Sequence, residues 1–424
     1  MIRRDITQAL FLSAAGAALV NKRAEAQTCT APCYVRTAAE IAASVTPVNT
    51  SYAPGNVLRY GTNTTPGTTD MTSAFQSAFN QQAQTGGAPV YVPTGSYLIT
   101  ATIAISSSLP FTMYGDGMGK SVITKTGDSD AFDVTNTNSA YNQTAISDLT
   151  LTTTTTMTSG SGFKITYSVP IPLPTVTMRD VLIITLNGSG FAAGVQLNDC
   201  AEAEFTRVSI IGSTPTAGTG FVITASQTPT GAAGPIKWVG CSVYDVKCGA
   251  YASTTTDPGI EGLQFYGCDF VGVETGVIAT SSSYAPPQLT WIGGHINASV
   301  QSFNLTNITQ VLIQGLLSYS SGSSTEHIAL TNVPAINITG NIFEQTGSGT
   351  AVHGVVIGVS AALNAGIIAN NMFNLSASSN AVYLLEAANT NNLTILGNVR
   401  VGGAATVAAV GTMTSSTIVA NNSP

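Results

Sequence analysis

Two carboxylates and a histidine are the residues of this sequence best suited to do chemistry together: Asp269, His295 and Glu344. Cleavage of a glycosidic bond needs one carboxyl group that holds a proton and acts as the acid, and a second, ionised group that acts as base or nucleophile. A separation of ~5 Å between them gives retention at the anomeric carbon, and ~6.5–9.5 Å gives inversion. We predict that Asp269 is the acid or base, that Glu344 is its partner, and that His295 tunes Asp269.

Aromatic and polar residues beside these three are candidates for binding a sugar chain. Tyr244 and Tyr319 would flank the group as flat platforms, and Asn297 would add an amide. Asp245 is a further substrate-binding candidate and, with Asp269, forms an alternative carboxylate pair. The plainer interpretation is that Asp269 and its neighbours are ordinary polar residues of an exposed surface.

A short repeated phrase positions these residues. It appears as Gln264-Phe-Tyr-Gly-Cys-Asp-Phe270 and as Thr290-Trp-Ile-Gly-Gly-His-Ile296. Its glycine, or an equivalent residue, recurs at intervals of 22 to 33 residues, at Asp148, Asp180, Arg207, Gly240, Gly267, Gly293, Gly315, Gly340, Asn370 and Gly397. Such an interval is typical of a solenoid with one coil per repeat. An antiparallel sandwich, the alternative, would place turns every ~8–12 residues.

Side-chain alternation along the strands of the coils predicts which residues point outward. One outward column would contain Ser242, Asp269, His295, Leu317 and Ile342, and a second Tyr244, Val271, Asn297, Tyr319 and Glu344. Adjacent coils lie ~4.8 Å apart, so Asp269 and His295 should be neighbours, with Glu344 two coils beyond His295. Inward positions should hold a structural amide ladder and stacked core thiols: Asn341, Asn371 and Asn398, and Cys241 and Cys268.

The segment before the coils has its own pattern. Residues 59–125 contain Arg59-Tyr-Gly-Thr, a helix expected over Asp70 to Ala83 with Asp70 as N-cap, Gly86-Gly87, and the strand pair in 90–100. This order resembles the N-terminal section of the pectate-lyase superfamily, which includes rhamnogalacturonase-like and polygalacturonase-like hydrolases, uronate lyases, epimerases and phage tailspikes. The resemblance implies an all-β fold, a right-handed single-stranded parallel β-helix with an N-terminal capping helix.

The resemblance extends loosely to the candidate site. The order Asp245, Asp269, Gly294-His295 is similar to the Asp, Asp-Asp and Gly-His-Gly series of polygalacturonases on consecutive coils. This chain departs from that series, because it has no Asn-Thr-Asp, no paired Asp-Asp, no Gly after His295 and no later Arg-x-Lys. The resemblance therefore implies the fold more than the reaction.

Basic residues are absent between Lys247 and Arg400. Elimination from a uronate normally uses Arg, Lys or a bound cation to stabilise the developing charge, so a uronate lyase centred on this face is disfavoured unless Ca²⁺ substitutes. Calcium prefers six to eight oxygen ligands, and no dense acidic cluster appears in the sequence. We expect no metal and no cofactor.

Structural roles are expected for the charged or titratable residues at three other places. Glu204 and Lys237 should form a surface ion pair on neighbouring coils, and His327 and His353 lie in turn-like sequence.

The first 27 residues have the pattern of an export signal, with Arg3-Arg4, an apolar run from Ala9 to Val20, and Ala24-Glu-Ala26 at the cleavage point. We predict a periplasmic or secreted protein in which residues 28–58 form a lead-in and 59–424 the β-helix domain. Removal of the signal takes four basic and two acidic residues and moves the formal net charge from −7 to −9. A chain this acidic has no electrostatic reason to bind nucleic acid, or a membrane in its mature form.

An oxidising compartment would allow a disulfide between Cys29 and Cys33. The oligomeric state, including a homotrimer, stays open. Together these features favour an exported protein that binds and hydrolyses a polysaccharide along one lateral face. Charged residues make up only 8% of the chain, which leaves open two alternatives: a non-catalytic surface, adhesion or tailspike-like structural protein, or a polysaccharide lyase.

Overall fold

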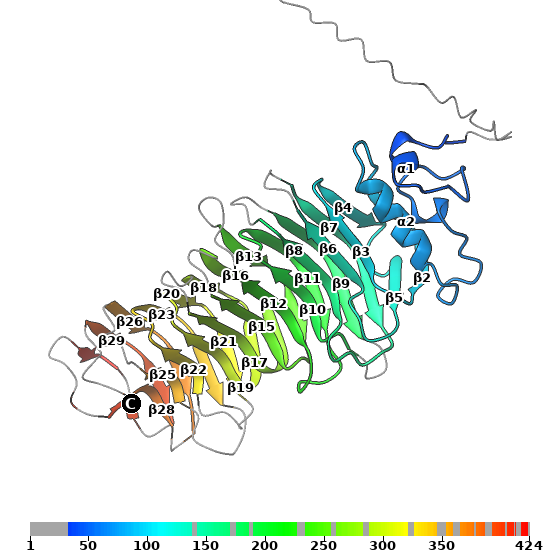
Figure 1. Cartoon of the computed structure of the whole chain (residues 1–424). Coiled ribbons are helices and arrows are strands. Elements are labelled where there is room, and N and C mark those ends of the chain that lie inside the picture. The colour runs from blue at the N-terminus through cyan, green and yellow to red at the C-terminus, as the bar shows by residue number, and fades with distance from the viewer. Residues whose placement is uncertain are drawn as a thin grey trace, which may run out of the picture.

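The computed structural model describes residues 33–137, 142–169, 175–185, 190–226, 234–255, 260–282, 288–320, 326–345, 353–358, 365–376, 379–385, 392–402, 405–410, 412 and 417–422. The predicted signal (1–27) and Cys29 lie outside these residues. Within them, 32 strands wind into an elongated parallel solenoid, with the N-terminal segment packed on one end (Figure 1). No helix in the described ranges is long and apolar enough to cross a membrane.

Each full coil contributes one strand, or part of a longer strand, to each of three parallel sheets, which we name A, B and C in chain order. Sheet A contains β1 (Val90–Val92), β4 (Phe111–Gly115), the first parts of β7 (Thr144–Thr153), β9 (Val176–Thr185) and β11 (Ala203–Ile211), then β13 (Pro235–Val239), β16 (Gly262–Tyr266), β18 (Gln288–Ile292), β20 (Gln310–Gln314), β23 (Ala335–Thr339), β26 (Ala365–Ala369), β29 (Leu393–Leu396) and β32 (Ile418–Ala420).

Sheets B and C follow the same order along the chain. Sheet B contains β2 (Gly95–Ile99), β5 (Ser121–Lys125), the second parts of β7, β9 and β11, then β14 (Ser242–Tyr244), the first parts of β17 (Asp269–Ser281) and β19 (His295–Thr306), β21 (Leu317–Ser320), β24 (Ile342–Gln345), β27 (Met372–Asn374) and β30 (Val399–Val401). Sheet C contains β3 (Ile103–Ser107), β6 (Phe132–Asn136), β8 (Ser161–Tyr167), β10 (Ala193–Asn198), β12 (Thr219–Ala225), β15 (Cys248–Thr254), the second parts of β17 and β19, β22 (Glu326–Thr331), β25 (His353–Gly358), β28 (Asn380–Leu384) and β31 (Ala405–Ala409).

The bend between sheets A and B falls on the repeated glycine position. All ten marker residues, from Asp148 to Gly397, have left-handed backbone angles, with φ between 52° and 69°. Glycine adopts this conformation without strain, and asparagine and aspartate tolerate it better than other residues. The recurring phrase is therefore the signature of a single-residue corner, and the predicted solenoid is confirmed.

The strand register also confirms both predicted columns on sheet B. Consecutive strands pair Ser242 with Asp269, Asp269 with His295, and so on to Ile342, and likewise Tyr244 through to Glu344. Just inside the A–B corner, the Nδ2 of Asn341 donates to the Oδ1 of Asn371, and that of Asn371 to Asn398, which continues the ladder to Asn422.

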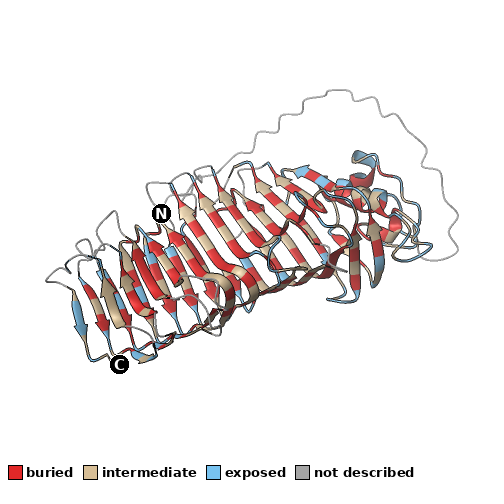
Figure 2. Ribbon diagram, turned by 90° about the horizontal axis from the view of Figure 1, so that it is seen from below, coloured by how far each residue is buried: buried red, intermediate tan, exposed pale blue. Residues whose placement is uncertain are grey.

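Large aromatic rings fill the bore between the sheets. Phe205, Trp238, Phe265 and Trp291 occupy the same place on four successive coils and stack with ring centroids 5.6, 4.3 and 5.0 Å apart. Figure 2 shows the alternation of buried and less buried residues along the strands, as the period of two predicts. Cys241 and Cys268 are buried free thiols of this core, as predicted.

A helical cap covers the N-terminal end. It contains α1 (Ala38–Ala42), the short 3₁₀ helix η1 (Val57–Arg59) and α2 (Thr72–Gln82), and the rings of Phe75 and Phe79 pack against those of Tyr97, Phe111 and Phe132. The predicted capping helix is therefore present.

One detail of the cap differs from expectation. Met71, and not Asp70, is the N-cap of α2, because Asp70 stays bridged to Leu98 of β2; its carboxylate still accepts from the N–H of Thr72 at 2.9 Å. A buried ion pair joins Glu40 of the lead-in to Arg59, the first residue of the predicted β-helix domain. Cys33 is disulfide-bonded.

Candidate functional site on the outer face of sheet C

The predicted site on sheet B brings only part of its residues together. Asp269 and His295 are paired on adjacent strands, and the ring of His295 meets that of Tyr319 edge-on, with centroids 5.2 Å apart. Burial lowers the pKa of His295 below its usual value, while the charge of Asp269 opposes this shift. No ion pair within 4.0 Å joins the two described side chains, so their relation is one of proximity.

The distance between Asp269 and Glu344 is too long for the predicted carboxylate pair. Glu344 lies three coils from Asp269 by the strand register, about 14 Å along the axis at ~4.8 Å per coil, and two residues further along its strand. Both hydrolytic geometries need less than ~9.5 Å. Asp269 and Glu344 therefore do not form an acid–base pair in this structure.

The alternative pair fails for a related reason. Asp245 sits at the corner after β14, with φ of 51°, three residues beyond Ser242, which is the partner of Asp269. Three strand residues span about 10 Å, so Asp245 is also out of reach of Asp269. Asn297 and Tyr319 do stand beside one another on sheet B, and Tyr244 lies two coils before Asn297.

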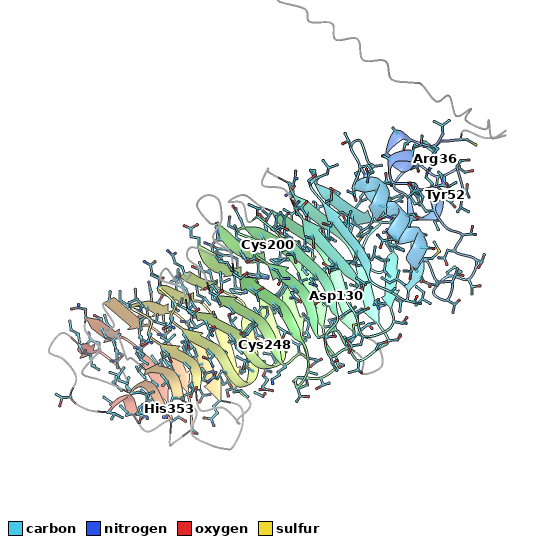
Figure 3. The ribbon with its side chains drawn as sticks, viewed as in Figure 1. Arg36, Tyr52, Asp130, Cys200, Cys248 and His353 are labelled. Carbon is cyan, nitrogen blue, oxygen red and sulfur yellow. The ribbon has the colours of Figure 1, made fainter. Side chains whose placement is uncertain are left out.

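A compact charged group lies instead on the outer face of sheet C, toward the N-terminal end of the solenoid, where Figure 3 labels Asp130. Lys164 of β8 is the strand partner of Asp133 of β6. Its Nζ donates to Asp133 at 3.2 Å and to Asp130 at 3.4 Å. Because both oxygens contact one nitrogen, they are at most about 6.6 Å apart. That limit includes the ~5 Å carboxylate separation of retaining glycosidases and only the lower edge of the ~6.5–9.5 Å range of inverting ones.

The three side chains are partly buried and held in place. The N–H of Ser161 donates to Oδ1 of Asp130 at 2.8 Å, whereas Oδ1 of Asp133 is buried with no partner among the described residues. Burial would lower the pKa of Lys164, but its hydrogen bond to Asp133 and the charges of Asp133 and Asp130 raise it above its usual value. Lys164 is therefore a fixed cation and not a base.

Two further charges stand at the corner before β6. Lys125 is buried and donates to the carbonyl oxygens of Thr126 and Gly127. The carboxylate of Asp128 accepts from the hydroxyl and N–H of Thr158 and from the N–H groups of Ser159 and Gly160. These donors, led by Thr158, hold the pKa of Asp128 well below its usual range. Asp128 thus anchors a loop that borders the site.

Amides and hydroxyls continue the face beyond Lys164. Gln196 of β10 is the strand partner of Lys164, its amide accepts from Ser161 at 2.9 Å and donates to Asn198 at 3.1 Å, and Asn198 accepts from Thr224 at 2.8 Å. Tyr251 follows on β15, next to Val222. Neutral donors and acceptors therefore extend along the axis from the carboxylates, which is the lining a sugar chain needs.

The sequence pattern predicted turns at His327 and His353, but both histidines lie on strands. His353 lies on β25, beside Glu326 and stacked on Tyr383 with ring centroids 4.8 Å apart, far along the body from Asp130 (Figure 3). His327 points into the bore, where its Nδ1 bonds the hydroxyl of Ser318 at 2.7 Å. Burial lowers the pKa of His327 to about 3. Strand alternation, extended to sheet C, would have separated the outward His353 from the inward His327.

The charged group escaped the sequence interpretation because no repeated phrase marks the corner between sheets B and C. A usable signal existed. The chain has 14 basic and 21 acidic residues among 424, yet Asp128, Asp130 and Asp133 stand within six positions, and Lys164 follows one coil later. Charges that cluster in so neutral a chain indicate a site.

Two other expectations concern metal binding and a surface ion pair. In the described ranges, no group of three His, Cys, Asp or Glu side chains could hold a metal ion. Glu204 and Lys237 are strand partners, but they form no ion pair within 4.0 Å.

Comparison with known proteins agrees with this architecture. Residues 55–179 match the model of a family described as rhamnogalacturonase A/epimerase, pectate lyase-like; the matched range contains Asp130, Asp133 and Lys164 and ends before Asp269. The matched segment and the fold together support a right-handed parallel β-helix of the pectate-lyase-like superfamily. A search of curated proteins found no match.

Solved structures with this fold are distant in sequence. The A-module of mannuronan C-5 epimerase AlgE6 from Azotobacter vinelandii has a TM-score of 0.62 and 18% identity over 87% of this chain and 98% of its own. The catalytic unit of the GH87 α-1,3-glucanase from Streptomyces thermodiastaticus has a TM-score of 0.51 and 13% identity over 93% and 70%. Pre-mature gene product 12 of bacteriophage phi29 reaches 0.50 and 13% over 86% and 55%. At these identities the likeness is one of fold.

Proposed function

We propose that this protein is a glycoside hydrolase that cleaves a neutral polysaccharide on the outer face of sheet C, with Asp130 and Asp133 as its two carboxylates. The observation that carries the proposal is the single ammonium of Lys164, which contacts both carboxylates and so limits their separation to at most about 6.6 Å. Proteins of similar fold include a glucanase and an epimerase, which is consistent with carbohydrate chemistry.

The surroundings of the two carboxylates differ and support different roles. Asp130 is fixed by the N–H of Ser161, so we assign it as the ionised base or nucleophile. Asp133 keeps one oxygen with no donor in the described part of the chain, and we assign it as the acid that protonates the leaving oxygen. Lys164 contacts both groups from the adjacent strand and offsets their mutual repulsion.

Charge favours a neutral substrate over a uronate. Around the site, Asp128, Asp130 and Asp133 outnumber Lys125 and Lys164, and both lysines are already engaged. A uronate carboxylate would meet net negative charge and no unpaired cation. For the same reason hydrolysis is favoured over β-elimination at this site. The disulfide of Cys33 supports export, because disulfides persist in oxidising compartments.

The test is incubation of the protein with neutral and acidic polysaccharides, followed by assays of new reducing ends and of unsaturated uronide absorbance. We expect reducing ends from a neutral polysaccharide, and a loss of about 10²–10⁴-fold in rate for Asp130→Asn, with Asp269→Asn as the matched control that keeps the activity. Unsaturated products would refute hydrolysis. Binding without any cleavage would assign the protein to the non-catalytic class.

A further inference from the structure

We propose that a groove on the outer face of sheet A, separate from the carboxylates of sheet C, is a second, non-catalytic binding site for a neutral polysaccharide chain. The ligand class rests on the proposed function; the groove itself does not. It has a volume of about 390 Å³ and crosses β18, β20, β23 and β26 in the C-terminal half of the solenoid, strands that lie side by side in Figure 1.

Two columns of outward residues shape the groove. Strand register aligns Gln288, Gln310, Ala335 and Ala365 in the first column, and Thr290, Leu312, Asn337 and Ile367 in the second. In the first column, long side chains on two coils give way to alanines on the next two. The loss of bulk at Ala335 and Ala365 leaves a hollow that is bounded by Gln310 at one side and by the second column along its length.

The lining has the chemistry of a neutral sugar site. Gln288, Gln310 and Asn337 line the groove and are exposed, so their side-chain amides are accessible to a ligand. Each amide offers donors and an acceptor that match sugar hydroxyls. Leu312 and Ile367, the latter 46% exposed, provide apolar surface for the C–H face of a sugar ring.

The groove contains no charged residue, and the chain has no Lys or Arg between Lys247 and Arg400. A polyanion, whether a nucleic acid or a polyuronate, would therefore gain no ion pair or counterion release there. The four strands span about 14 Å at ~4.8 Å per coil, which is room for a short run of sugar units parallel to the solenoid axis. An extended neutral polysaccharide is the ligand that fits this length, polarity and absence of charge.

The two sites are on different faces, so they can be tested separately. In an Asp130→Asn background, which removes cleavage, we would measure binding of hydroxyethyl cellulose, soluble starch and galactomannan by affinity gel electrophoresis. We expect one of these polymers to retard the protein, and the double change Gln310→Ala and Asn337→Ala to weaken its binding about tenfold, since each lost hydrogen bond contributes ~0.5–1.5 kcal/mol. Gln314→Ala is the matched control, because Gln314 ends the same strand, β20, outside the groove.

A complementary variant fills the groove without removing an amide. Ala335→Gln restores the bulk of the preceding coils and should also weaken binding, while turnover of short soluble oligosaccharides by the protein with Asp130 intact stays unchanged. Equal binding by all variants, or binding to none of the three polymers, would overturn the inference. A self-association that the Ala335→Gln change abolishes would also overturn it and assign the groove to a second copy of the chain. Binding that depends on the groove, in a protein that cleaves nothing, would refute only the proposed function.

Discussion

The outer faces of sheets B and C have the same strand spacing but opposite arrangements of charge. On sheet B, Asp269 and Glu344 are separated by three coils. On sheet C, Asp130 lies in the corner segment just before β6, Asp133 lies in β6, and both contact Lys164 of the adjacent strand. In a solenoid, residues of one column are separated by multiples of ~4.8 Å, whereas a corner residue and a strand residue of one coil can both contact a single side chain of the next coil. The approach of the two carboxylates on sheet C therefore depends on the corner segment and on Lys164, and not on the spacing of a column.

The largest change in activity is expected from one of two isosteric substitutions, one on each sheet. Asp133→Asn should reduce polysaccharide hydrolysis about 10²–10⁴-fold, because the acid can no longer donate its proton. Asp269→Asn should change it less than about twofold, as expected for a surface change of under ~0.5 kcal/mol. Initial rates of reducing-end release measure both. If Asp269→Asn were the more damaging change, the active face would be sheet B.

A smaller effect is expected for the lysine that distinguishes the two faces. Lys164→Met should lower the rate roughly tenfold, because Asp130 and Asp133 would repel each other without the ammonium between them. Since salt screens such repulsion, activity of this variant should recover partly as ionic strength rises, and the wild type should not gain. Lys164→Arg, which keeps the charge, is the control. A Lys164→Met protein with full activity at low salt would remove Lys164 from the site.

A third comparison concerns stability rather than activity, and sets His327 in the bore against His295 on sheet B. Burial lowers the pKa of His327 to about 3, so the unfolded chain, with an ordinary histidine pKa near ~6.5, binds the proton more strongly. The contribution of neutral His327 to the free energy of unfolding is fully present above pH ~6.5, the pKa in the unfolded chain. It falls by up to ~1.4 kcal/mol per pH unit as the pH drops from ~6.5 toward 3.

Denaturant titrations at pH 7, 5 and 4 measure this loss. His327→Gln should flatten the acid dependence, whereas His295→Gln should flatten it less, because His295 is only half-buried and the charge of Asp269 opposes its shift. An unchanged slope in His327→Gln would show that other groups, and not this histidine, govern the acid sensitivity.

Most of the fold could be predicted because its determinants are local. The corner residue at positions such as Gly267 and Asn370 needs a left-handed backbone, and the strands after it alternate inward and outward. From these two rules follow the columns of sheet B, the ladder of Asn341 and Asn371, and the buried Cys241 and Cys268. The N-cap of α2 was missed because Asp70 is held by a contact with Leu98 that sequence order does not reveal.

The candidate site was less predictable, since its parts are distant in sequence and its corner has no fixed length. The register after Gly267 correctly made Asp269 and His295 neighbours, but neighbours along a column do not make a carboxylate pair. Lys164 and Asp130 are 34 positions apart, and the segment between sheets B and C differs in length from coil to coil. A repeat pattern aligned on the A–B corner therefore carries no information on which side chains meet at the opposite one.

By itself the sequence determined a polar, charge-poor parallel β-helix with a helical cap. The coil interval, the left-handed corners and the strand alternation can each be recognised from residues that are close together in the sequence. Only the tertiary structure decided which charges face one another, and where a groove opens on sheet A. Both depend on the lateral stacking of coils, which brings together residues about thirty positions apart and sets the contacts of Asp130, Asp133 and Lys164.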